Sequence, residues 1–204
     1  MKNLFIIFIL FSFSLSAQKV DKKDEKTKSY NSIINNEVIT DQGLFKVHKR
    51  GDEYYYEIHP TQLNQEMLMI TRIAKTINGI GYGGQKINSQ VLRWQKKNNQ
   101  ILLRIVSYEN IASDSLPIYE SVRNSNFEPI LYAFEIETHN PEDSSVLINV
   151  SPLFNTDVKA LGFPQFRRKS LKITSLDKKR SFIESIKSFP TNIEVRNVLT
   201  YIST

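Results

Sequence analysis

Apolar positions along the chain come in short runs bounded by polar turns, a spacing that predicts strands more often than helices. Residues 44–49 and 53–58 flank Arg50-Gly51-Asp52 and predict a first hairpin. Residues 91–95 and 101–106 flank a polar stretch and predict the clearest hairpin of the sequence. Four further runs predict strands, at residues 67–75, 130–137, 146–150 and 193–201.

Short helical pieces are expected between these strands. Pro60 suits the first turn of a helix, and Ser151 is expected to cap a turn that runs to Asn155. The best helix candidate is 119–126, whereas 161–169 resembles a loop and 182–189 remains undecided between helix and strand. The sequence therefore predicts a mainly antiparallel β or α+β fold, with several hairpins and a few short helices.

The first residues form the pattern of a signal peptide. A positive start at Lys2 precedes the apolar stretch 4–13, and small residues lead to a predicted cut after Ala17 or after Ser16. The apolar stretch is about ten residues long, too short to span a bilayer, so we expect no membrane span after cleavage. The protein is therefore expected to be exported and to be periplasmic, outer-membrane-associated or extracellular. The predicted divisions are a signal peptide at 1–17, a flexible polar leader at 18–37, a short β-hairpin domain at 38–66 and a β-rich domain at 67–204.

Composition adds two constraints to this picture. With 40% hydrophobic residues, 12 phenylalanines and 9 tyrosines, the chain can bury a core. The sequence contains no cysteine, which excludes disulfides, thiolate metal sites and a lipid anchor at the cut. Stability must therefore come from the core alone.

The charge balance is mildly basic. The formal net charge is +6, and it falls to +5 when Lys2 leaves with the signal peptide. Basic clusters at residues 96–97, 167–169 and 178–180 could hold single-stranded nucleic acid beside stacked aromatic rings. An exported protein meets little nucleic acid, so we expect solvated turns and no nucleic-acid partner.

Motifs for catalysis and metal binding are absent from the sequence. The three histidines, His48, His59 and His139, lack the spacing of a helical zinc site, and no HExxH or GxSxG is present. His48 and His59 could approach each other across the first hairpin, but surface or half-buried histidines are the expected case. A serine triad assembled from distant positions would leave no sequence signal, so a hydrolase stays as a third hypothesis.

A glycine-rich stretch at residues 78–84 holds four of the seven glycines. Gly79 and Gly84 have the separation of a phosphate-binding loop, but Gln85 replaces the lysine and a strand follows in place of a helix. A loop between strands is therefore expected. Tyr82 among the glycines could press the backbone against a partner domain.

Several segments taken together resemble a known protein family: residues 80–84, 90–94, 107–110, 117–131, 177–190 and 199–201. They are similar to the N-terminal region of large secreted zinc-dependent metalloproteases of Gram-negative bacteria. In that family a short leader domain and a β-rich domain of unknown function precede the protease domain. The similarity covers residues 40–201.

The resemblance implies that the chemistry lies further along the polypeptide, where a helical HExxH holds zinc and its glutamate activates water. This chain carries no such motif, so the expectation is a non-catalytic segment without cofactor, with zinc only in the protease domain. The expected partners are that protease domain and a protein or peptide substrate. The β-rich domain is expected to be incomplete at its C-terminus, with an unpaired edge near residues 195–201 that makes the isolated chain prone to aggregate.

The contact surface with such a partner is expected at the glycine loop and at the predicted helix near residue 123. Under the simpler alternative the loop is only a turn and Phe127 belongs to the core. The second functional hypothesis is a free-standing periplasmic or surface domain that binds peptide or glycan through exposed Tyr54 or Tyr56. The candidate contact residues are Gly81, Tyr82, Gly83, Gly84, Arg123, Asn124, Asn126 and Phe127.

Overall fold

The computed structural model describes residues 28–204, and the predicted signal peptide at 1–17 lies outside the described residues. All strand pairs between residues 28 and 204 are antiparallel, and the helices are short, which confirms the predicted fold class. None of the helices in this range is long and apolar enough to cross a membrane.

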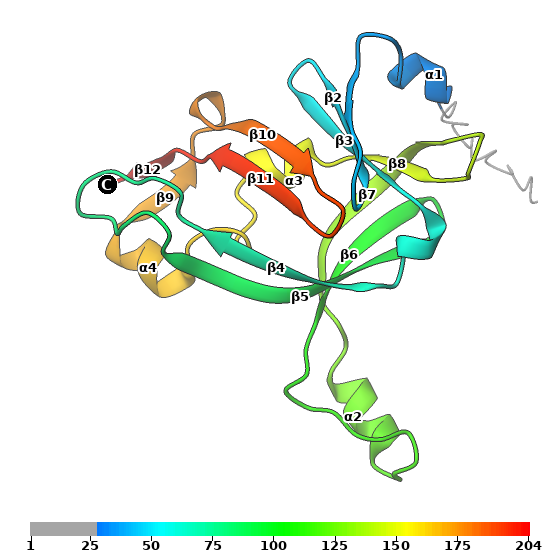
Figure 1. The fold of residues 1–204 in the computed structure, drawn as a ribbon. Coiled ribbons are helices and arrows are strands. Elements are labelled where there is room, and N and C mark those ends of the chain that lie inside the picture. Colours follow the sequence, from blue (N-terminus) through cyan, green and yellow to red (C-terminus); the bar gives the residue numbers. More distant parts are fainter. Residues whose placement is uncertain (1–27) are drawn as a thin grey trace, which may run out of the picture.

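The largest element is an eight-stranded sheet with the strand order β1-β2-β3-β8-β7-β6-β5-β4 (Figure 1). Strands β1 to β3 run in chain order from one edge toward the centre of the sheet, and β4 to β8 run in chain order from the other edge toward the centre. Strands β3 and β8 are therefore neighbours inside the sheet. The strands are β1 (Ile39–Asp41), β2 (Lys46–Arg50), β3 (Glu53–Ile58), β4 (Glu66–Arg72), β5 (Lys86–Lys97), β6 (Gln100–Val106), β7 (Ile130–His139) and β8 (Val146–Asn149).

Two small two-stranded sheets complete the fold. One is the hairpin of β10 (Phe182–Ser188) and β11 (Ile193–Val198), and the other pairs β12 (Tyr201–Ser203) with β9 (Ile173–Leu176). The helices are α1 (Tyr30–Ile33), α2 (Tyr119–Ser125), α3 (Ser151–Asn155) and α4 (Gln165–Ser170), with 3-10 turns η1 (Pro60–Gln62) and η2 (Lys178–Arg180).

Both predicted hairpins are confirmed. Gly51 lies between β2 and β3 with φ of 59°, and Asn98 lies between β5 and β6 with φ of 53°. Glycine and asparagine tolerate this left-handed backbone, which a tight turn between twisted strands requires. The predicted helix near residue 119 is also confirmed as α2.

Two local expectations differ from the structure, and one undecided segment takes a definite form. Residues within the expected loop 161–169 form α4, and the undecided run 182–189 is strand β10 because its partly buried side packs on the sheet and β11 pairs beside it. Ser151 is not the helix cap but the first residue of α3. Its Oγ instead accepts a 2.7 Å hydrogen bond from the backbone N–H of Tyr54, which ties α3 to β3.

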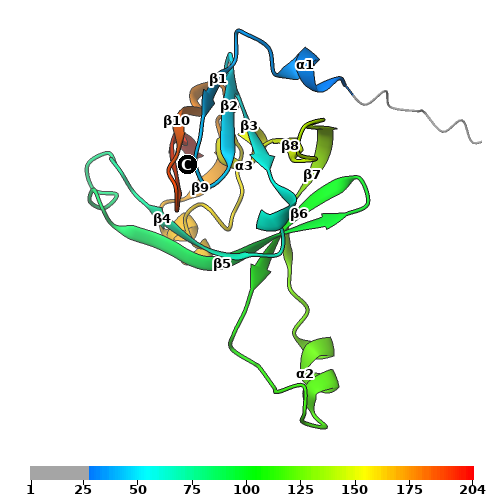
Figure 2. The ribbon, with the colours of Figure 1, turned by 45° about the vertical axis from the view of Figure 1, so that its right-hand side comes forward.

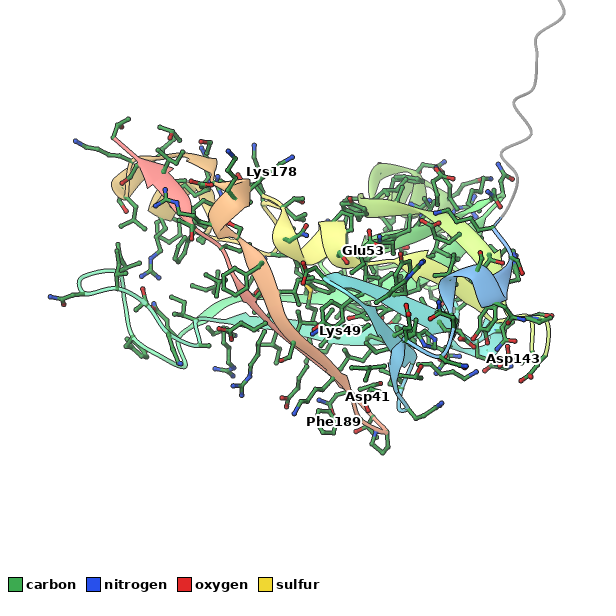
Figure 3. All side chains as sticks on the ribbon, turned by 90° about the horizontal axis from the view of Figure 1, so that it is seen from above. Asp41, Lys49, Glu53, Asp143, Lys178 and Phe189 are labelled. Atoms are coloured by element: carbon green, nitrogen blue, oxygen red, sulfur yellow. The ribbon has the colours of Figure 1, made fainter. Side chains whose placement is uncertain are left out.

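The core lies between the eight-stranded sheet and the β10–β11 hairpin. Its centre is aromatic: the rings of Phe45 and Tyr56 each lie edge-on to Trp94, with centroids 6.0 and 6.1 Å away. Figure 3 shows Phe189, at the tip of the hairpin, beside Asp41 of β1. The Ser188 hydroxyl donates a 2.7 Å hydrogen bond to the carbonyl of Phe45, so the two sheets are joined by polar contacts as well as by packing.

The N-terminal part of the described chain belongs to the fold. The sequence predicts a polar leader up to residue 37, yet Ile33 of α1 is 1% exposed and packs on Tyr55 and Leu147. Order therefore begins before Val38, because α1 supplies an apolar residue that covers the outer side of β3. Strand β3, from the predicted hairpin segment 38–66, pairs with β8, from the predicted segment 67–204, so both segments share one sheet.

Candidate interaction surface

The predicted contact residues fall into two separate places. Gly81, Tyr82, Gly83 and Gly84 lie in the loop between β4 and β5, whereas Arg123 and its neighbours lie in or after α2. Figures 1 and 2 show the β4–β5 loop at one end of the sheet and α2 at the tip of an arm that projects away from it. The structure does not join the two groups into one surface.

The glycine loop is held against the body of the molecule by α4. The guanidinium of Arg167 donates a hydrogen bond to the carbonyl of Ile80. A Cβ on Gly81, which has φ of 142°, would come within 2.5 Å of the Gln85 side chain. Tyr82 is 68% exposed. The loop is therefore fixed at its base and presents one aromatic ring to solvent.

The second group of candidate contact residues lies on the segment 107–129, which leaves the sheet after β6 and returns to it at β7. We call this segment the arm. Asn124 of α2 is exposed, and the Asn110 side chain donates a 3.0 Å hydrogen bond to Asn126, joining the two limbs. Monomeric proteins rarely gather large exposed apolar side chains in one place unless they bind something. Five such side chains on the arm are at least half exposed: Tyr108, Ile111, Leu116, Ile118 and Phe127.

The base of the arm is fixed to the sheet by two arginines. One Nη of Arg93 lies 2.8 and 2.9 Å from the two carboxylate oxygens of Glu128, and its other Nη lies 2.6 Å from Glu66. Arg104 donates a 2.8 Å hydrogen bond to the Glu128 carbonyl and lies 5.0 Å from the ring centroid of Phe127. Phe127 is 72% exposed and is not a core residue. Its ring is instead held in place by stacking on a cation.

Glu66 connects the arm to the edge strand β4. It accepts hydrogen bonds from the Tyr108 hydroxyl and from Arg93, and these bonds lower the pKa of its carboxyl group below the ordinary value. Glu66 is therefore ionised at neutral pH. The contact orients the arm relative to β4, because Tyr108 is the second residue of the arm.

A buried polar cluster lies on the other side of the molecule, and sequence reasoning missed it. The Glu57 side chain is fully buried and accepts four hydrogen bonds: 2.7 Å from Tyr30, 2.6 Å from Lys46, 2.8 Å from His48 and 2.8 Å from Asn140. The β2–β3 register places Lys46 directly opposite Glu57. The sequence did carry a signal for this cluster. Glu57 stands among the aromatic residues of the second predicted strand, and Lys46 and His48 stand two positions apart on the first, so that both can face the same side of the hairpin.

The cluster is built to hold a charge. Burial alone would raise the pKa of Glu57, but the hydrogen bonds from His48, Lys46, Asn140 and Tyr30 outweigh burial and hold the pKa far below its ordinary value. Since a carboxylate only accepts, Nε2 of His48 donates to Glu57, and Nδ1 lies 2.8 Å from the Thr40 hydroxyl. Four donors fill the acceptor sites of the carboxylate, so this arrangement supports stability and leaves no oxygen free to act as a base.

The histidines do not meet. His48 is buried in the cluster, against the expectation of a surface or half-buried position, because α1 and Asn140 cover this side of β2 and β3. His59 caps η1 through the backbone N–H of Thr61, and His139 lies 3.2 Å from the Lys96 ammonium. Within residues 28–204, no group of three or more metal-ligating side chains is placed to hold an ion.

A shallow polar depression of about 420 Å³ lies beside α4 and β9. Arg168 lines it and binds Asp157 through two hydrogen bonds of 2.8 and 2.6 Å, so these two charges neutralise each other. Lys159, Lys169 and Lys172 complete a basic rim. The depression is open to solvent and lies at the opposite end of the fold from the Glu57 cluster.

Two family models match the chain. The domain of unknown function DUF5118 matches residues 27–76, and the domain of unknown function DUF5117 matches residues 84–204. No curated protein and no solved structure matches the chain. The two matched segments meet at the β4–β5 loop, and strands from both build the eight-stranded sheet. The DUF5117 model covers more than half of the residues, so the chain belongs to the DUF5117 family, with a DUF5118 segment in front.

Proposed function

We propose that this chain is the non-catalytic N-terminal module of an exported zinc metalloprotease, where it packs on, chaperones or positions the protease domain or its protein substrate. The observation that carries the proposal is the arm, which holds five large apolar side chains away from the core. The family resemblance of residues 40–201 supports the protease context. In this proposal zinc and the catalytic residues belong to the protease domain, and this chain contributes neither.

The arm has the anatomy of a binding element. Ile111, Leu116, Ile118 and Phe127 supply exposed apolar surface, and the exposed ion pair between Arg123 and Glu120 on α2 supplies polar groups beside it, the two kinds of surface that an interface combines. Full burial of one such apolar side chain against a partner is worth about 1.5–3 kcal/mol. Burying several of them offsets the loss of freedom on association and gives a specific contact. The rigid base at Arg93 and Arg104 presents the arm in one orientation.

The alternative is a free-standing periplasmic or surface domain that binds peptide or glycan. It was expected to use exposed Tyr54 or Tyr56, but the two residues are 4% and 3% exposed and belong to the core. Both faces of β3 are covered, one by the core and the other by α1, so neither ring is free to bind a ligand. This alternative therefore lacks the exposed tyrosine rings on which it depends.

The gene itself offers the first test. Genomic DNA downstream of codon 204 should contain a reading frame, in phase or shifted, that continues to an HExxH helix. A stop codon followed by unrelated sequence would remove the protease context and leave a free-standing binding domain.

The second test places two aspartates in the arm of the longer protein, as Ile111→Asp with Phe127→Asp. Both side chains are more than 70% exposed, so folding should be unaffected while secretion or proteolysis falls. The matched control is Phe166→Asp, which changes an equally exposed phenylalanine on α4, away from the arm. Normal secretion and proteolysis in the arm variant would refute the contact role.

A further inference from the structure

Strand β4 is an edge of the eight-stranded sheet and is unusually apolar for an edge. Within residues 28–204 it pairs only with β5. Met67 and Met69 turn inward and pack against the core, while Leu68 and Ile70 face outward and are 65% and 46% exposed. Soluble proteins usually protect such edges, because an unpaired strand is a template for another strand.

Two other strands with a free edge, β1 and β11, carry protection that β4 lacks. Strand β1, at the opposite edge, has only three residues and ends in Asp41. Strand β11 has one neighbour and exposes Glu194 and Arg196 along its length. In β4 the only charged residues are Glu66 and Arg72, one at each end.

The positions of these two charges make β4 complementary to itself. In an antiparallel pair of two β4 strands centred on Met69, Glu66 lies opposite the partner's Arg72, and Leu68 lies opposite the partner's Ile70. All four of these side chains are exposed and share the outer face of the strand. The exposed face would thus gain two ion pairs and two apolar pairs, each a favourable cross-strand combination.

We propose that the protein forms a two-fold symmetric dimer through β4, which joins two eight-stranded sheets into one continuous sheet. The same patch serves on both copies, as a two-fold axis requires. Both end residues keep bonding capacity: Glu66 uses one oxygen for Arg93 and the other for Tyr108, and Arg72 uses one Nη for the Gly84 carbonyl. A strand from a different protein is the competing occupant, and the experiments separate the two.

Cysteine cross-linking tests the register directly, because the chain has no cysteine of its own. In the proposed dimer Met69 lies opposite itself, within the Cα separation of about 4.4–6.8 Å that a disulfide needs. Met67 lies opposite Thr71 of the other copy. The two Met67 residues are therefore separated by four positions, or roughly 13 Å along the strand. Mild oxidation of Met69→Cys should give a covalent dimer on a non-reducing gel, whereas Met67→Cys, which faces the same side, should not. Equal cross-linking of both variants, or of neither, overturns the proposal.

A charge exchange tests the same register without oxidation. The double variants Leu68→Lys with Ile70→Lys, and Leu68→Glu with Ile70→Glu, place like charges opposite each other and should each have the mass of one chain by light scattering. Mixed in equal amounts, they should recover the mass of two chains, since each lysine then faces a glutamate. Ser89→Lys, an exposed change on neighbouring β5, should leave the wild-type dimer intact.

Two results of these mass measurements overturn the proposal. One is a wild-type mass of a single chain at every concentration at which the protein stays soluble. The other is a wild-type monomer whose β4 amides become protected from hydrogen exchange only when another protein is added, which would assign the edge to that protein.

Discussion

The Tyr30 hydroxyl donates a 2.7 Å hydrogen bond to the buried carboxylate of Glu57, which fastens α1 to the hairpin of β2 and β3. Ile33, at the end of the same short helix, is buried against Tyr55 and Leu147. A helix of four residues has no stability of its own, so these two contacts hold it in place. The cluster around Glu57 thereby closes the outer side of the sheet.

The substitution Glu57→Gln should destabilise the fold by about 3–5 kcal/mol, because it removes one partner from a buried charged network. The amide NH₂ of the glutamine would also face donors where the carboxylate now accepts. Urea unfolding followed by tryptophan fluorescence measures the change, since Trp94 lies in the core. Glu142→Gln, at an exposed position near the cluster, should stay within about 0.5 kcal/mol of wild type. Equal stability of the two variants would contradict a structural role for Glu57.

The same cluster predicts how stability depends on pH. The pKa of Glu57 is lower in the folded protein than its ordinary value of 4.5, so its contribution is present above that value and is lost as the pH falls below it. The free energy of unfolding of wild type should therefore begin to fall near pH 4.5 and keep falling as the pH is lowered further, because the folded carboxylate takes up its proton only at much lower pH, and that of Glu57→Gln should fall less. Parallel curves for the two proteins would assign the acid sensitivity to other carboxylates.

Removing the hydroxyl of Tyr30 tests the fastening of α1. Tyr30→Phe should cost about 1–3 kcal/mol, since it deprives a buried carboxylate of one of its donors. Amide hydrogen exchange should accelerate in α1 and along β2 more than elsewhere. Tyr119→Phe, a half-buried tyrosine of α2, is the matched control and should leave both measurements unchanged. Unaltered exchange in α1 of Tyr30→Phe would show that Ile33 alone holds the helix.

Gly43, between β1 and β2, lies where the chain closely approaches the β10–β11 hairpin. A Cβ at this position would lie 2.5 Å from the Ser188 hydroxyl and 2.7 Å from the backbone nitrogen of Phe189. Gly43→Ala should therefore push the β10–β11 hairpin outward and cost about 1–3 kcal/mol by overpacking. Gln42→Ala, at the exposed neighbouring position, should have little effect in the same thermal unfolding experiment. A Gly43→Ala protein as stable as wild type would mean that the hairpin tip moves freely.

The hairpins were predictable because their signals are local. Gly51 and the polar stretch before Ile101 mark turns, and apolar runs on both sides supply the strands. Helix α4 was missed because its residues, Gln165–Ser170, have almost no apolar period. Its position depends on tertiary contacts, among them the ion pair of Arg168 with Asp157 and the contact of Arg167 with the glycine loop.

The environment of β3 could not be predicted from its own residues. A run of three tyrosines suggests one buried and one exposed face, but α1 covers the second face. The same long-range contacts bury Glu57, which in isolation resembles a solvated strand residue. The positions of the candidate contact residues were likewise undetermined, because they depend on where the arm leaves the sheet. Tyr82 and Phe127 are both exposed, but they lie on different parts of the molecule, the β4–β5 loop and the arm, and their role in a contact stays a prediction.

The pairing of β3 with β8 affects how the protein folds while it is being synthesised. Tyr54 of β3 bonds Ser151 beyond the end of β8, a residue 97 positions later in the chain. At a synthesis rate of about 5–20 residues per second, the first hairpin waits roughly 5–20 s for its central neighbour. During this interval the edge of β3 that pairs with β8 has no partner, and the large loop that must close makes the step slow. Factors that guard nascent chains against aggregation should therefore matter most for this protein while β3 is made and β8 is not.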